Sequence, residues 1–304
     1  MPYRIKRKES VQSAVRRLTC ERVDHALDCL AHGEEAAAIH AARKDIKKIR
    51  AVLRLLRQRI SKKDFQRLAK HLRKAARCLG PARDAYTQSQ MLGKLVGHFK
   101  RELNAVAVRP LQANLRNRCA AAMTRFRQKN SRAAIARSFR NCRRGLKRLR
   151  VNGGGWKAVG AGVAECHAAG RAAYRRARGE PSPENFHAWR KCAKDLWYQI
   201  RLLRRIWPDE LNGIAAELKH LGDWLGDDHD LAMLVLDMAE ADGTGAQPSD
   251  IDALRGLAQV RQGELRTNAL ELGERFYGED TTAFCERLGG YWKSWRNQRS
   301  QAAA

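Results

Sequence analysis

Hydrophobic residues recur every three or four positions along most of the chain, a spacing typical of α-helices that pack on other helices. The alternating pattern of β-strands is nearly absent, and Gly or Pro interrupts the sequence at helix-length intervals. The short connections favour antiparallel bundles, so the expected fold class is all-α. The predicted helices span residues 10–32, 34–60, 62–79, 81–104, 109–128, 131–150, 156–178, 183–207, 209–225, 228–241, 249–276 and 280–299.

Two predicted helices, 147 positions apart, carry the same pattern. Apolar residues occupy positions 39, 42, 46, 49, 53 and 56 of the first and 186, 189, 193, 196, 200 and 203 of the second. One position further round each helix is a mainly basic row, which reads His40, Arg43, Lys47, Arg50, Arg54, Arg57 and His187, Arg190, Lys194, Trp197, Arg201, Arg204. Each row is about 25 Å long. This length suits an extended polyanion better than a single phosphate, and the repetition predicts an internal duplication.

Glycines at matching positions suggest where helices end. Leu79-Gly-Pro-Ala-Arg-Asp84 and Leu225-Gly-Asp-Asp-His-Asp230 each place Gly where one helix is expected to stop and Pro or Asp where the next begins. A tight turn is therefore predicted at each. The glycine run at 151–155 predicts the boundary between two helical repeats, 1–152 and 153–304, of a single domain over 1–304. Residues 242–249 are expected to form a solvated loop.

The net charge of +28 indicates a polyanionic partner, because counterion release favours binding of phosphate backbones. A protein that is simply basic is the alternative. Residues 1–152 contain 40 Lys and Arg against 10 Asp and Glu, and residues 153–304 contain 20 against 22. The first repeat is therefore strongly basic and the second near neutral.

Basic rows also run along the helices predicted at 62–79 and 131–150. A single row of this kind is most often a solvated face. Several rows with few acidic neighbours favour a phosphate-binding surface, because like charges three and four positions apart repel one another. The candidate phosphate-binding residues are His40, Arg43, Lys44, Lys47, Arg50, Arg54, Arg57, Arg67, Lys70, Arg73, Lys74, Arg77, Arg140, Arg143, Lys147, His187, Arg190, Lys191, Lys194, Arg201 and Arg204.

The two histidines have equivalent positions in their rows. A lone histidine is usually a hydrogen-bonded core residue, and that alternative stays open for both. Because His40 and His187 lie among Lys and Arg in both rows, contact with a ligand is the competing interpretation. Protonated imidazoles would donate hydrogen bonds to phosphoryl oxygens, and binding would then strengthen as the pH falls.

Eight cysteines are scattered without a C-x-x-C pair or zinc-ligand spacing, so no metal or cofactor is expected. Unpaired cysteines are typical of a reducing compartment, and a cytosolic location is therefore expected. No apolar run approaches the roughly 20 residues of a membrane helix. Asp227-Asp-His-Asp230 could be interpreted as a metal cluster for phosphoryl hydrolysis. Successive residues of a helix cannot all face one ion, however, and an N-cap is the simpler prediction. Catalysis is therefore not expected.

These motifs resemble the CHAD family, the conserved histidine α-helical domain. Tyr3–Ser10 resembles its opening, His40-x-x-Arg43-x-x-x-Lys47-Lys48-x-Arg50 its first histidine motif and His187-x-x-Arg190-Lys191-x-x-Lys194 its second, and the two Leu-Gly segments resemble its paired acidic turns. The resemblance implies two pseudo-symmetric four-helix bundles around a basic central cleft that binds inorganic polyphosphate. Some members are fused to a triphosphate-hydrolysing domain; the chain contains no such β-rich segment, so that activity is not expected.

The sequence departs from this pattern at Trp197, which stands where the first repeat has Arg50, and in the helix at 209–225, which lacks a basic row. An unequal contribution of the two repeats is therefore expected. The predicted function is polyphosphate binding, in the cytoplasm and at polyphosphate granules. Nucleic-acid binding is the alternative, although the basic rows contain almost no aromatic residues for stacking on bases. The oligomeric state and the preferred chain length stay open.

Overall fold

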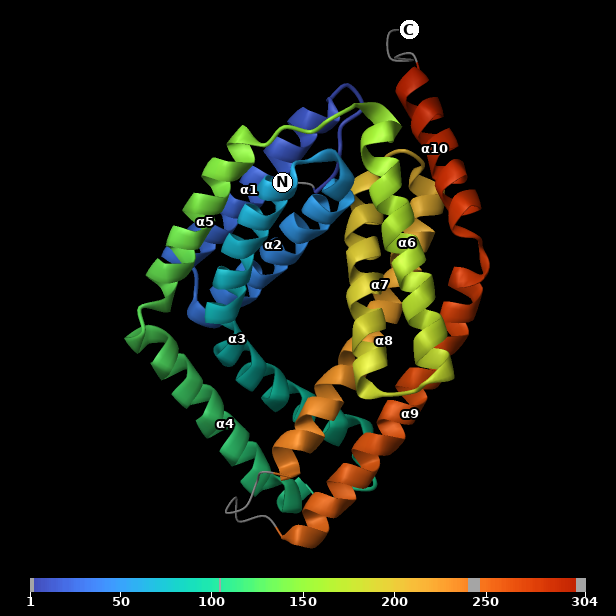
Figure 1. The fold of residues 1–304 in the computed structure, drawn as a ribbon. Coiled ribbons are helices and arrows are strands. Elements are labelled where there is room, and N and C mark those ends of the chain that lie inside the picture. Colours follow the sequence, from blue (N-terminus) through green and yellow to red (C-terminus); the bar gives the residue numbers. More distant parts are fainter. Residues whose placement is uncertain (1–2, 104, 240–246, 299–304) are drawn as a thin grey trace, which may run out of the picture.

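The computed structural model describes residues 3–103, 105–239 and 247–298. These residues form α-helices, one short 3-10 helix and no strand, which confirms the all-α prediction. The helices are arranged as a ring, in which α2 and α3 lie opposite α7 and α8 (Figure 1). The elements are α1 (Val11–His32), α2 (Glu35–Leu55), η1 (Arg57–Arg59), α3 (Lys62–His98), α4 (Ala105–Gln128), α5 (Ser131–Arg148), α6 (Gly155–Gly179), α7 (Pro183–Leu203), α8 (Pro208–Ala239), α9 (Pro248–Gly278) and α10 (Thr281–Asn297).

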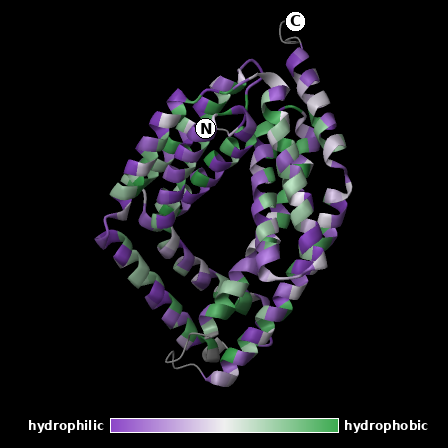
Figure 2. Ribbon diagram, in the orientation of Figure 1, coloured by the Kyte–Doolittle hydropathy of each residue, from purple (hydrophilic) through white to green (hydrophobic). Residues whose placement is uncertain are grey.

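Side-chain caps mark several helix starts. Ser10, Ser61 and Ser182 each accept a hydrogen bond from the backbone N–H three residues ahead, at the starts of α1, α3 and α7. Such caps satisfy N–H groups that have no partner within the helix. Hydrophilic and hydrophobic residues are interleaved along the helices (Figure 2), as expected for helices with one buried face.

The tight turns predicted at Gly80 and Gly226 are wrong, because α3 and α8 each continue through the glycine. Pro81 lies inside α3, and two nearby residues, Leu79 and Ala82, are buried in the core. Packing therefore holds the helix together although Pro81 lacks an N–H. In Figure 1, α3 changes direction along its length, as a proline kink would produce.

The hydrophobic core joins the two halves of the chain. Its largest cluster combines side chains of α1, α2, α5 and the first part of α3 with others from α6, α7 and α10. A second cluster joins the last part of α3 and α4 to α8 and α9. Burial therefore does not divide the chain at residue 152, and the division into two repeats stays a prediction.

The predicted boundary at 151–155 lies on the connection between α5 and α6, and its last residue, Gly155, is the first residue of α6. Gly153 has φ +83°, a backbone conformation that favours glycine. The Asn152 N–H donates to the Arg59 carbonyl at 2.8 Å, which ties this connection to the end of η1.

A close contact between α2 and α6 fixes the position of α2 beside the second half. A Cβ at Gly162 of α6 would lie only 2.0 Å from the Leu55 carbonyl oxygen. Because only glycine permits this approach, the end of α2 rests directly on α6. α7 packs between α6 and α8 and also touches α2. This arrangement brings the two basic rows to the same part of the molecule.

Most of the loop predicted at 242–249 lies outside the described residues, and its last two residues, Pro248 and Ser249, form the start of α9. All eight cysteines are free thiols. Among the described helices, none is both long enough and apolar enough to span a membrane.

Candidate anion-binding site

A basic cavity of about 170 Å³ lies between α2 and α7. Six of its lining residues come from the predicted site: Lys47, Arg50 and Arg54 from α2 and Arg190, Lys191 and Lys194 from α7. Asp195 and Tyr198 complete the lining. The structure therefore brings together cations that are more than 130 positions apart in the sequence. We refer to this space as the central cavity.

Lys47 has the clearest electrostatic signature in the central cavity. Its side chain is exposed to solvent, yet the surrounding protein lowers its pKa to about 8 by desolvation. Repulsion from Arg190, Arg43, Arg83 and Lys194 lowers it further. Positive charge is therefore concentrated here beyond what nearby carboxylates neutralise.

Arg190 and Arg43 flank this lysine. Burial lowers the pKa of both guanidinium groups. The Asp230 carboxylate partly opposes both shifts, and Asp84 also opposes that of Arg43. Arg43 lies 3.9 Å from Asp84, which is at the outer limit of an ion pair. Within the described residues, the Arg190 Nε is buried without a hydrogen-bond partner, so this donor is unsatisfied in the ligand-free protein.

Two glycines of α8 make room for the cations of α7. A Cβ at Gly222 would lie 2.6 Å from the Lys194 Cε, and one at Gly226 would lie 3.2 Å from the Arg190 Nε. Both side chains therefore lie against the α8 backbone. Gly226 thus serves close packing, which explains why it does not end a helix.

Carboxylates pair with two of the cavity cations. Lys194 donates to Asp223 of α8 at 2.8 Å, and Arg54 forms an ion pair with Asp195 of α7. Lys219 also donates to Asp223, at 2.9 Å. An anionic ligand would compete with these pairs, whereas Lys47 makes no ion pair within the described residues.

The two histidines at equivalent positions of the rows, His40 and His187, have different surroundings. The His187 ring lies over the His229 ring, with 3.9 Å between centroids, and burial together with His229 lowers the pKa of His187 to about 4. Burial and the cations Lys44 and Arg83 lower the pKa of His40. Both rings are therefore mainly neutral at neutral pH in the ligand-free protein. A bound polyanion would have to raise these pKa values before either ring became protonated.

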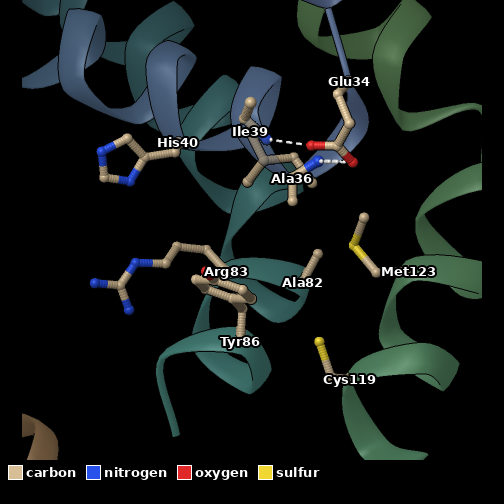
Figure 3. Close-up of a pocket in the computed structure, with 10 residues that line it drawn as sticks. Glu34, Ala36, Ile39, His40, Ala82, Arg83, Tyr86, Cys119 and Met123 are labelled. Atoms are coloured by element: carbon tan, nitrogen blue, oxygen red, sulfur yellow. Dashed lines mark hydrogen bonds between the residues drawn. The ribbon is translucent and has the colours of Figure 1, made fainter. Parts of the chain in front are cut away.

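His40 lines a different, mostly apolar pocket of about 530 Å³. Figure 3 shows His40 and Arg83 on the same side of this pocket, with Tyr86 below and Met123 of α4 opposite. Arg83 acts electrostatically on both His40 and Lys47. This arginine therefore lines the apolar pocket and adds to the positive potential at the central cavity.

The remaining predicted residues lie outside the central-cavity lining. Arg143 forms a two-point ion pair with Asp24 of α1, with N–O distances of 2.6 and 2.9 Å, so its row on α5 runs along α1. Arg204 lines a separate pocket with Arg4 and Arg205. The others in this group, apart from the histidines, are Arg43, Lys44, Arg57, Arg67, Lys70, Arg73, Lys74, Arg77, Arg140, Lys147 and Arg201.

Some of these outlying residues have partners of their own. The Arg57 guanidinium lies 5.4 Å from the centre of the Phe65 ring, and that of Arg201 lies 4.7 Å from the Trp197 ring. Arg67 is paired with Asp64 at 2.5 Å. The exposed side chains of α3 at 73 and 77 line a separate shallow hollow, and burial together with Arg73 lowers the pKa of Arg50 in the central cavity.

The sequence interpretation missed Arg83, His229, Asp195, Asp223 and Tyr198. A signal for two of them was present, because Arg83 and His229 are separated by the same 146 positions as Gly80 and Gly226. The contribution of Asp223 depends on the packing of α8 on α7, for which the sequence carries no comparable signal.

The segment 227–230 is not a metal cluster or an N-cap, because it lies in the middle of α8 and its side chains have separate partners. Asp227 accepts from Lys94 at 2.8 Å and Asp228 from Arg266 at 2.7 Å, while His229 lies on His187. Within the part of the chain that the structure describes, no group of three or more His, Cys, Asp or Glu side chains could hold a metal ion.

Comparison with known proteins agrees with this architecture. The family model of the CHAD domain matches residues 15–236, which is more than half of the chain. The fold resembles PptA from Streptomyces chartreusis, with a TM-score of 0.63 and 14% identity over 88% of this chain and 100% of that chain. It also resembles the CHAD domain from the plant Ricinus communis, with a TM-score of 0.56 and 13% identity over 99% and 98% of the two chains. No curated protein matches the sequence.

Proposed function

Because the chain belongs to the CHAD domain family, we propose that it binds inorganic polyphosphate in the central cavity. The observation that carries this proposal is the convergence of six Lys and Arg side chains from α2 and α7, against one lining carboxylate, Asp195. Such an excess of cations is unfavourable in the empty protein and becomes favourable when an anion binds.

The types of cation suit a phosphate chain. The guanidinium groups of Arg50, Arg54 and Arg190 can each donate two parallel hydrogen bonds to phosphoryl oxygens. The lysines act as point charges, and an approaching anion would stabilise the charged form of Lys47. Arg43 and Arg83 extend the positive charge beyond the cavity, so successive phosphoryl groups of one chain would find partners.

We test this function by titrating polyphosphates of graded length at two salt concentrations. Affinity should rise with chain length until the cationic track is filled and should fall steeply with salt. The double variant Lys47→Ala/Arg190→Ala should bind much more weakly. A matched control, Lys70→Ala/Arg140→Ala, removes the same charge from exposed positions outside the cavity and should bind almost normally.

Equal losses in the two double variants would mean that only net charge matters, and the cavity would then not be the site. Competition with RNA tests the alternative ligand. The one aromatic residue that lines the central cavity, Tyr198, is only 5% exposed, so it offers no open ring for a base. Polyphosphate should therefore remain bound against an equal phosphate concentration of RNA.

We further propose that the protein acts by binding alone, within the cytoplasm at polyphosphate granules. Incubation with polyphosphate and Mg²⁺ or Mn²⁺ should release no orthophosphate above background. A fluorescent fusion should colocalise with granules, and the Lys47→Ala/Arg190→Ala variant should not. Orthophosphate release that depends on the protein would refute the binding-only role.

A further inference from the structure

A second cationic pocket lies where α7 ends and α8 begins. Its volume is about 710 Å³, and its lining includes Arg4, Arg204, Arg205, Trp207 and Asp209. It shares no lining residue with the central cavity. Arg190 and Arg204 are 14 residues apart, which corresponds to about 20 Å along a helix. The two sites are therefore separate.

Three arginines carry the charge of this pocket, and Asp209 is the one carboxylate in its lining. Within the described residues, none of the three guanidinium groups forms an ion pair with a carboxylate. Burial lowers the pKa of Arg4, and Arg205 and Arg204 lower it further. Arg4 is therefore repelled by its arginine neighbours, and an anionic ligand would relieve this repulsion.

An open aromatic face distinguishes this pocket from the central cavity. The Trp207 side chain is 43% exposed, and Tyr291 of α10 stacks on it with 4.9 Å between ring centroids and 24° between planes. In the described part of the chain, no cation and no other ring lies over Trp207. Tyr291 therefore stacks against the indole, and a planar ligand can reach the exposed part of Trp207.

We propose that this pocket binds a phosphate attached to a nucleoside, with the base stacked on Trp207 and the phosphate held by Arg204 and Arg205. Aromatic stacking beside guanidinium groups is how proteins hold unpaired bases and their backbone. A polyphosphate chain could satisfy the arginines, but it has no planar group for the indole. The ligand is therefore a single-stranded nucleic acid or a free nucleotide, which share this chemistry.

The test uses labelled oligoadenylate of about 12 nucleotides and an abasic oligomer of equal length. Both are titrated by fluorescence anisotropy into the Lys47→Ala/Arg190→Ala variant, so that the central cavity does not contribute. The oligoadenylate should bind more tightly than the abasic oligomer. Trp207→Ala should remove this preference, a loss of roughly 5- to 100-fold in affinity for the oligoadenylate.

Further variants separate stacking from charge and from folding. Trp207→Phe keeps an aromatic ring and should retain most of the preference for bases. Arg205→Gln should weaken both oligomers alike, whereas Arg175→Gln, at an exposed position of α6 outside the pocket, should weaken neither. Thermal unfolding measured by circular dichroism checks that each variant is folded.

Competition with ATP identifies the source of the ligand. Displacement of the oligoadenylate by ATP at equal nucleotide concentration indicates a free nucleotide, and failure of ATP to compete indicates a strand. Equal affinities for the two oligomers would overturn the proposal. So would a folded Trp207→Ala variant that still prefers bases.

Discussion

Polyphosphate binding should weaken as the pH rises from 7 to 9, and Lys47 should be responsible. In the ligand-free protein the pKa of Lys47 is lowered to about 8 by desolvation and by neighbouring cations such as Arg190. A bound polyanion favours the charged ammonium and therefore raises this pKa. The lysine contributes its full charge to binding below pH 8, and above it the protein must first take up a proton.

The size of the effect follows from linkage. If the ligand returns the pKa of Lys47 to the ordinary lysine range, affinity falls by about tenfold between pH 7 and pH 9. Lys47 is exposed to solvent, so water and salt screen part of this interaction. The expected decrease is therefore about three- to tenfold.

Isothermal titration calorimetry with long-chain polyphosphate measures both affinity and proton uptake. Experiments at pH 8.5 in two buffers of different ionisation enthalpy should reveal uptake of at most about one proton per complex. Lys47→Arg is the matched control, because a guanidinium stays charged throughout this range. An unchanged affinity from pH 7 to 9, or the same decrease in Lys47→Arg, would refute this account of the site.

Three further predictions concern the site and the fold. Arg190→Ala should weaken polyphosphate binding by about 10- to 100-fold in a titration, because it loses charge-assisted hydrogen bonds, whereas Arg140→Ala, on the exposed face of α5, should change it by less than about threefold. Gly162→Ala should lower the free energy of unfolding by about 3 kcal/mol or more in chemical denaturation, because its Cβ would overlap the Leu55 carbonyl. Asp45→Ala should cost about 3–5 kcal/mol in the same assay, because the fully buried Asp45 carboxylate is the shared partner of cations from α1 and α2.

The helical fold could be predicted because its signals are local. Apolar spacing and breaks at Gly or Pro report on neighbouring residues, and they located most helices to within a few positions. The prediction failed at Gly80 and Gly226, where local signals for a helix end are opposed by tertiary packing. At Gly226 the missing side chain makes room for Arg190 of another helix, a requirement that the sequence around Gly226 does not express.

The candidate site could be predicted only in part, for a similar reason. The periodic rows identified the cations of α2 and α7, six of which line one cavity. Which rows meet depends on how the helices pack. The row containing Arg143 resembles the others in sequence, but the structure places that residue against Asp24 of α1. Charge periodicity along one helix therefore predicts a cationic face without predicting what that face contacts.

The lysines on the two sides of the central cavity, Lys47 of α2 and Lys194 of α7, differ in whether a carboxylate pairs with them. Lys194 of α7 is paired with Asp223, and a ligand must compete with that carboxylate for its charge. By the spacing of the two Leu-Gly segments, the position matching Asp223 in the first half is Arg77, so a cation replaces the carboxylate there. Lys47 accordingly makes no ion pair among the described residues and is repelled by its neighbours. Since binding relieves repulsion at Lys47 and must compete with an ion pair at Lys194, we expect Lys47 to contribute more to the affinity than Lys194.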